Sequence, residues 1–359
     1  LPLLFLWALA IGAMRCTNTW DVPPNLLLAL GALAIAAFSQ PWQGWPGLLG
    51  RAGAVAWQFG LVFLLSWSVL YWPFWANYGS YYNSLALWTG TRTQWWAYIV
   101  VHGLFLFVVT SYLVVRALEH GGALRPDPVL RRIQLTIRYR RKRRRLGHVA
   151  RLLGVRGLPV RMLVWLALAA LILLELFFVI PGLISFTSPG AEAVEAGANA
   201  YRGLAVFALG LPVAALGLLL LFRPRIPPVE RFWAYLVLLG LAMTLGVEVI
   251  VVEGDVGRMN TVFKFYLQVW LMWGVAAAAA LAWMAPRLRR WSQGRNLWLG
   301  ILILLLAGAA LYPPLATSAK IRDRFEAGLG PGLDGWDYME TASYFDPQGQ
   351  EYELKWDLE

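Results

Sequence analysis

The stretch that decides the fold class is Gln94-Trp-Trp-Ala-Tyr-Ile-Val-Val-His-Gly-Leu-Phe-Leu-Phe-Val-Val-Thr-Ser-Tyr-Leu-Val-Val-Arg116. It holds no Asp, Glu or Lys, and its only Arg is the last residue. An apolar run of about 20 residues is what a helix needs to cross the hydrocarbon core of a bilayer. Similar runs recur at about 1–14, 25–39, 53–74, 161–180, 202–222, 232–252, 261–284 and 296–314. We therefore expect an all-α polytopic membrane protein with about nine transmembrane helices.

The composition argues against a soluble protein. Of the 359 residues, 59% are hydrophobic and only 14% are charged, whereas soluble domains carry about 25% charged residues. The single cysteine, Cys16, cannot form an internal disulfide and so does not indicate a redox compartment. Because the chain begins inside an apolar run and ends in an acidic segment, we expect it to be cut from a longer protein at both ends.

The net charge of +11 comes from one loop. The stretch from Arg116 to Arg161 holds 14 of the 31 Lys and Arg residues and only two acids. A basic loop between apolar blocks is typical of a cytoplasmic loop under the positive-inside rule, and it contacts anionic lipids more readily than nucleic acid. We expect a transmembrane domain over 1–316 with loop 117–160 in the cytoplasm. We expect residues 317–359 to be the start of an extracytoplasmic acidic segment.

Several catalytic motifs are missing. The chain has no GxxxxGK[ST] loop, no HExxH helix and no CxxC pair. The classes of protein set aside on this ground are P-loop NTPases, zincins and thiol oxidoreductases.

The densest polar segment between apolar blocks is Glu248-Val-Ile-Val-Val-Glu-Gly-Asp-Val-Gly-Arg-Met-Asn-Thr-Val-Phe-Lys264. Asn260 and Lys264 are spaced four apart and share a helix face. A helix start flanked by Arg258 and Lys264 is a candidate phosphate site. The alternative is that both cations are neutralised by Glu248, Glu253 or Asp255 and only hold two helices together. Such charges are costly in a membrane and favour a partner or a wet cavity.

Two further segments carry candidate residues. Asp21 precedes Pro23-Pro24, so it is either an N-terminal cap of the next helix or a general base or metal ligand. Tyr81 and Tyr82 belong to the aromatic loop 77–83, which suits stacking on a sugar or lipid headgroup and equally suits interfacial anchoring. His102 and Glu175 lie inside helices, where we expect satisfied polar contacts.

Three stretches carry a family resemblance: Asn18-Thr-Trp-Asp21-Val-Pro, Arg258-Met-Asn-Thr-Val-Phe-Lys-Phe-Tyr266 with Gln268 and Trp270, and Leu333-Asp-Gly335. They resemble the Chlor_Arch_YYY family of polytopic membrane proteins, a domain of unknown function, from about residue 1 to the end of the chain. The tyrosine triplet that names the family lies in N-terminal helices that this chain lacks, and Tyr81-Tyr82 is not that triplet. The family is distantly similar to C-type glycosyltransferases, which is an analogy at the level of the fold.

The resemblance implies a protein of the bacterial or archaeal cell membrane. It also implies transfer of a sugar from a polyprenyl-phosphate carrier to an acceptor on the extracytoplasmic face. The expected catalytic residues are Asp21, Glu253 and Asp255; the expected substrate-binding residues are Arg258, Asn260, Lys264, Tyr81 and Tyr82; and the expected ligands of a divalent metal, Mg or Mn, are Asp21 and Asp255. Membrane lipids are expected partners and nucleic acid is not. The rival interpretations are a transporter or lipid flippase and a non-catalytic membrane scaffold.

Overall fold

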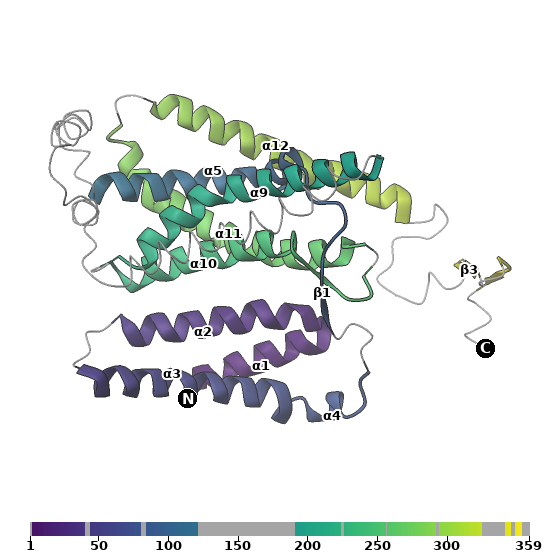
Figure 1. Ribbon diagram of the computed structural model, residues 1–359, viewed down its shortest axis with the longest axis horizontal. Helices are drawn as coiled ribbons and strands as arrows, with labels where there is room; N and C mark the ends of the chain where they lie inside the picture. Colours follow the sequence, from purple (N-terminus) through teal and green to yellow (C-terminus); the bar gives the residue numbers. More distant parts are fainter. Residues whose placement is uncertain are drawn as a thin grey trace. The chain divides into compact units, whose positions relative to one another are not determined.

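A computed structural model of the chain describes residues 2–39, 44–79, 84–120, 191–223, 226–255, 257–291, 294–324, 342–345 and 349–353. They belong to two compact units, Leu1–Arg295 and Asn296–Glu359. Figure 1 gives the element labels used below. The predicted helix at 161–180, Glu175, Tyr81, Tyr82 and the basic loop lie outside the described residues.

The N-terminal part of the first unit is a group of helices around a small apolar core. Its elements are α1 (Pro2–Thr17), the 3-10 turn η1 (Thr19–Asp21), α2 (Val22–Phe38), α3 (Gly44–Leu64), the π-helical turn η2 (Leu65–Val69) and α4 (Trp72–Trp75). The core residues are Ala8, Ile11, Val22, Ala29 and Val62. Helix α2 begins with two prolines in its first turn, where the missing backbone N–H costs nothing.

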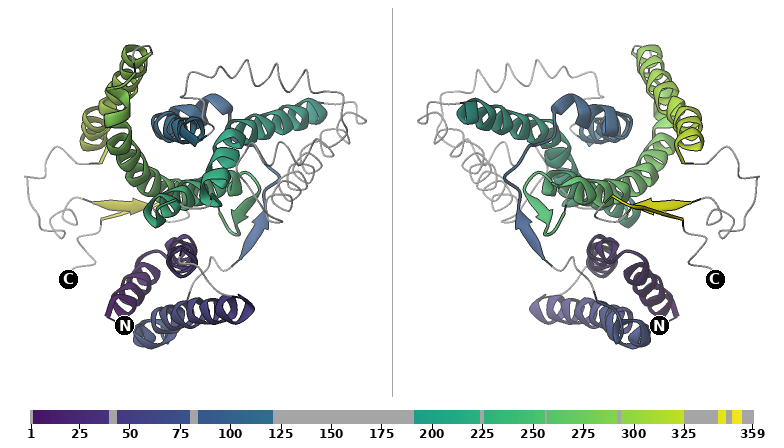
Figure 2. Two further views of the ribbon diagram at one scale, coloured as in Figure 1. Left: turned by 90° about the vertical axis from the view of Figure 1, so that its left-hand side faces the viewer. Right: turned by 90° about the vertical axis from the view of Figure 1, so that its right-hand side faces the viewer.

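Four long helices account for most of the remaining described residues of the first unit: α5 (Trp95–His120), α9 (Ala191–Leu221), α10 (Pro228–Gly246) and α11 (Met259–Leu288). Helix α10 packs against α9, α11 and α2, and the end-on views of Figure 2 show α10 and α11 side by side. The indole N–H of Trp233 donates to the Ala276 carbonyl at 2.7 Å, and that of Trp273 donates to the Val237 carbonyl at 3.1 Å. These two bonds fix α10 against α11.

The predicted helix over 232–252 is wrong at its C-terminal end. Helix α10 stops at Gly246, and β2 (Ile250–Val252) pairs antiparallel with β1 (Leu85–Leu87), with Leu87 opposite Ile250. The run from Val247 to Val252 is rich in β-branched residues, which favour strands. A short apolar run cannot be assigned to helix or strand by hydropathy alone. This ribbon of β1 and β2 is tied to α11 by the Val252 backbone N–H, which donates to the Thr261 hydroxyl at 3.0 Å.

The second unit contains the long helix α12 (Arg295–Arg324) and a hairpin formed by β3 (Ser343–Phe345) and β4 (Glu351–Glu353). The first residue of α12, Arg295, is the last residue of the first unit. Tyr344 and Tyr352 stack across this hairpin with ring centroids 5.4 Å apart. Helix α12 runs without a break through the predicted domain boundary at 316. That boundary stays a prediction.

Seven helices in the described ranges are long and apolar enough to cross a membrane: Thr19–Phe38, Pro46–Val69, Trp95–Glu119, Arg202–Leu221, Pro228–Gly246, Met259–Leu288 and Arg295–Asp323. Helix α1 is apolar but shorter. Many of their large apolar side chains are exposed, such as Val100 at 77%. Lipid tails would cover such faces in a bilayer. The prediction of a helical polytopic membrane protein is confirmed.

Candidate functional site

A buried ionic cluster lies where α10 gives way to the ribbon. Glu248 is fully buried. Its carboxylate accepts hydrogen bonds from the Thr93 backbone N–H at 3.0 Å, the Thr93 hydroxyl at 2.5 Å and Arg258 Nη1 at 2.9 Å. Arg92 Nε donates to the backbone carbonyl of Glu248 at 3.2 Å. A buried carboxylate is tolerated only with partners of this kind.

Arg258 is held on several sides. Besides Glu248, its guanidinium donates to the Val247 carbonyl and to the Thr93 hydroxyl, both at 2.8 Å, and it lies 5.7 Å from the ring centre of Trp88. The pairing of Arg258 with Glu248 is one of the alternatives that the sequence left open. Through this pair Arg258 ties the start of α11 to the end of α10.

Asp255 caps α11. Its carboxylate accepts the backbone N–H groups of Asn260 at 3.1 Å and Thr261 at 2.7 Å, and the Thr261 hydroxyl at 2.7 Å. Burial acts to raise the pKa of Asp255, but the hydrogen bonds from Thr261 and Asn260 outweigh it and hold this pKa below its usual value. The turn before the helix has positive φ at Gly254 (84°) and Gly257 (60°), a region that favours glycine. The N-terminus of α11 therefore already carries a carboxylate of the chain itself.

Glu253 lies beside the ribbon and is exposed. Its carboxylate accepts the Ser84 hydroxyl, and its backbone N–H donates to the Ser84 carbonyl at 3.0 Å. These bonds extend the β1–β2 pairing by one residue.

Asp21 meets α11 from a segment more than 240 residues away in sequence. The Gln268 side chain and the Lys264 ammonium both act on its carboxylate and favour its charged form. Asn18 Nδ2 donates to Asp21 Oδ1 at 2.8 Å, while Asn25 Nδ2 donates to the Asp21 carbonyl at 2.8 Å and to Gln268 Oε1 at 3.5 Å. Lys264 and Gln268 are one helical turn apart, so they share a face. We call Asn18, Asp21, Asn25, Lys264 and Gln268 the Asp21 cluster.

The Asp21 carboxylate makes no hydrogen bond to a backbone N–H of α2. The geometry therefore does not support the first role predicted for Asp21, that of an N-terminal cap of α2. Among the described residues, no group of three or more His, Cys, Asp or Glu is placed to hold a metal ion. Both oxygens of Asp255, the second predicted ligand, are engaged in capping. The metal ligation expected of Asp21 and Asp255 stays a prediction.

Comparison with protein families adds one finding. Residues 1–273 match the model of the family described as "Uncharacterized membrane protein (DUF2298)". The chain belongs to this family. No curated protein and no solved structure matches the chain. Its membership of the DUF2298 family and its apolar helices together identify an integral membrane protein.

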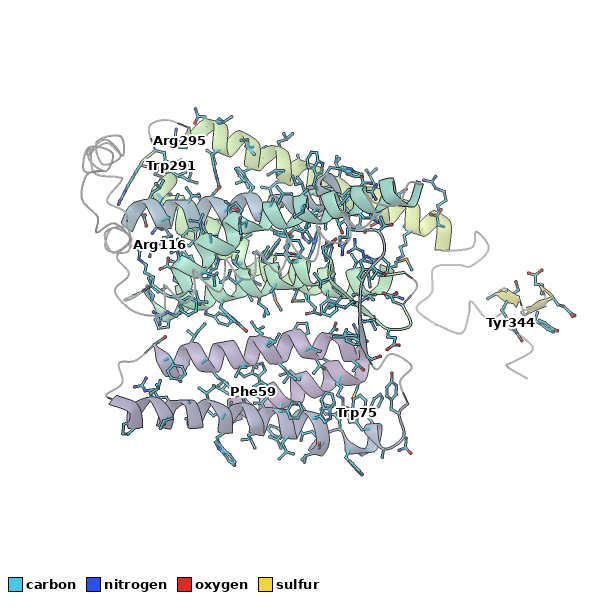
Figure 3. All side chains as sticks on the ribbon, viewed as in Figure 1. Phe59, Trp75, Arg116, Trp291, Arg295 and Tyr344 are labelled. Carbon is cyan, nitrogen blue, oxygen red and sulfur yellow. The ribbon has the colours of Figure 1, made fainter. Side chains whose placement is uncertain are left out.

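The DUF2298 chain carries a second ionic cluster that the sequence interpretation missed, at the opposite end of α5 and α11. Glu230 pairs with Arg116 and accepts the Tyr112 hydroxyl at 2.7 Å. Glu119 bridges Arg116 at 2.7 Å and Arg287 at 2.5 Å. Figure 3 labels Arg116 at this end. The available signal was Glu230 itself, an acid in the first turn of an apolar helix that begins with Pro228, since acids in a membrane bundle require partners.

His102 differs from its expected role as a satisfied polar contact in this DUF2298 protein. The ring is fully buried between Tyr98, Tyr266 and Trp273, with centroid distances of 4.9, 4.5 and 5.4 Å. Neither ring nitrogen has a hydrogen-bond partner within the described residues. The contacts of His102 there are aromatic.

Proposed function

We propose that this protein is a membrane-embedded glycosyltransferase that moves a sugar from a polyprenyl-phosphate carrier to an acceptor hydroxyl on the extracytoplasmic face. The observation that carries the proposal is the Asp21 cluster, in which Asn25 joins the Asp21 carbonyl to Gln268 of α11 and Lys264 attracts the Asp21 carboxylate. A carboxylate, an ammonium group and three side-chain amides converge from two distant segments of the chain. A capping role alone does not account for this convergence.

Asp21 supplies the base. It accepts the proton of the acceptor hydroxyl as the acceptor oxygen forms a bond to the anomeric carbon of the sugar. The bond between that carbon and the phosphate oxygen breaks, and the electron pair leaves with polyprenyl phosphate. A positioned general base accelerates such a step by about 10²- to 10⁴-fold.

Lys264 stabilises the charge that grows on the departing phosphate. Lysine is an effective phosphate partner because its ammonium is a compact charge on a flexible stem. The amides of Asn18, Asn25 and Gln268 each offer a donor and an acceptor, and they suit the hydroxyls of a sugar. The roles of Asn260, Glu253, Tyr81 and Tyr82 stay predictions.

Arg258 receives a positioning role in this proposal. Three of its N–H groups are engaged with Val247, Glu248 and Thr93, so it holds the first turn of α11. Lys264 lies about one and a half turns further along that helix. Asp255 holds the same turn from the other side, because both of its carboxylate oxygens accept backbone N–H groups of α11.

The test uses the purified full chain in lipid nanodiscs with a panel of radiolabelled polyprenyl-phosphate hexoses and pentoses. The measured quantity is the rate at which polyprenyl phosphate is released. We expect release from at least one donor, and a loss of about 10²-fold or more in Asp21→Asn. The matched control is Asp323→Asn, which removes an exposed carboxylate from α12. Its rate should equal that of the wild type.

Three results would overturn the proposal. Wild-type protein that releases no polyprenyl phosphate from any donor is not this enzyme. An Asp21→Asn variant that keeps the wild-type rate has no base at this position. Movement of intact lipid-linked sugar between leaflets without release would instead establish a flippase.

A further inference from the structure

An apolar groove follows α5 toward the end that carries the Arg116–Glu230 pair. It has a volume of about 440 Å³. One wall is a stripe of residues spaced four apart on α5: Leu106, Thr110, Val114 and Leu118. Trp291, just beyond the end of α11, also lines it. Figure 3 places Trp291 and Arg116 at the same end of the bundle.

Two free cations stand beside Trp291. Arg289 and Arg290 are exposed, and within the described segments neither has an ion pair or side-chain hydrogen bond. The other arginines of this end are engaged: Arg116 and Arg287 with carboxylates, and Arg231 with the Arg223 carbonyl. Two exposed arginines without a carboxylate partner among the described residues therefore adjoin Trp291, which lines the groove.

The dimensions of the groove fit one lipid tail. From Leu106 to Leu118 the helix rises about 18 Å, and one leaflet contributes about half of the 30 Å hydrocarbon core. The ion pair of Arg287 with Glu119 brings the end of α11 to the end of α5, so Trp291 lies near Leu118. A chain entering beside Trp291 can run along the stripe to the middle of the bilayer. Tryptophan is favoured at the headgroup level.

We propose that this groove is a binding site for an anionic phospholipid. One acyl chain lies along the α5 stripe, and the phosphate is bound by Arg289 and Arg290. The site needs both parts, because the arginines select the charge of the headgroup and the groove retains the tail. It is independent of sugar transfer at the Asp21 cluster, which lies at the opposite end of α11.

The experiment is native mass spectrometry of the full chain released from bilayers of equal phosphatidylglycerol and phosphatidylcholine. We expect the wild type to retain phosphatidylglycerol over phosphatidylcholine by about 30-fold, from the attraction of two arginines to anionic lipid. Arg289→Gln with Arg290→Gln should abolish this preference. Val114→Trp, at a position 40% exposed, should fill the groove and reduce phosphatidylglycerol retention with both cations present.

The matched control is Lys320→Gln with Arg322→Gln. It removes the same charge from exposed positions of α12 about 40 Å along that helix from Arg295, and it should leave the preference unchanged. An unchanged preference in the Arg289 and Arg290 variant would overturn the proposal. So would wild-type retention of both lipids equally. Full retention by a folded Val114→Trp variant would show surface attraction without a groove site.

Discussion

Replacing Arg258 by Met should destabilise the protein by about 3–5 kcal/mol, the cost of leaving a buried carboxylate without its cation. The estimate rests on the burial of the pair, since the side chains of Glu248 and Arg258 are 0% and 11% exposed. Replacing both partners, as Glu248→Leu with Arg258→Met, should cost less than Arg258→Met alone. The remaining penalty comes from the groups that lose a partner, chiefly the backbone N–H of Thr93, at about 1–3 kcal/mol.

The assay is reversible unfolding in mixed micelles with increasing SDS, which gives the free energy of unfolding of each variant. The control is Arg322→Met, which removes an exposed arginine and should change stability by no more than about 0.5 kcal/mol. A loss below about 1 kcal/mol for Arg258→Met is what a solvent-exposed pair would give. That result, or a double variant as unstable as the sum of the single variants, would refute the buried-pair reasoning.

Three further changes test local features through the same free energy of unfolding. Asp255→Ala removes the cap of α11 and should cost about 0.5–2 kcal/mol. Because the pKa of Asp255 is lowered on folding, its stabilisation is present above the unfolded value of about 3.9 and is lost as pH falls through the folded value. The acid-side loss of stability should therefore shrink in this variant, and an unchanged pH curve would contradict the cap. Gly240→Ala places a methyl group against an indole of α11 and should cost about 1–3 kcal/mol. Gly246→Ala, which meets no side chain within 4 Å, is its control, and equal effects would contradict the close packing. Tyr112→Phe removes a hydrogen bond to the buried Glu230 and should cost about 1.5–3 kcal/mol; no loss would mean that the bond is absent.

Hydropathy predicted most of the described helices because a bilayer imposes one requirement on every span. The expected blocks at 25–39, 94–116, 202–222 and 261–284 all lie on observed helices. Their ends were less certain, since caps and turns rather than apolar content decide where a helix stops. Helix α12 thus continues to Arg324, beyond the last apolar block, in residues with little hydropathy signal.

Pairings between distant segments were beyond the reach of sequence reasoning. The sequence predicted that Arg258 binds phosphate, with neutralisation by one of three acids as the alternative, and the fold pairs it with Glu248. Asp21 was a candidate from its position before two prolines, but nothing local pointed to Gln268 as its neighbour. The pairings of Glu230 and Glu119 with arginines at the C-terminal ends of α5 and α11 were not predicted, because a count of charges does not show which acids face inward.

The most direct test of the central claim is a double-variant cycle on the rate of polyprenyl phosphate release, with Asp21→Asn, Lys264→Gln and the combination. If base and cation act on one transition state, each single change lowers kcat/KM by about 10²-fold or more. The combination should then be little worse than the slower single variant, because groups that act as a unit are not additive. Fully multiplicative losses, or a wild-type rate in either single variant, would contradict a shared site at the Asp21 cluster.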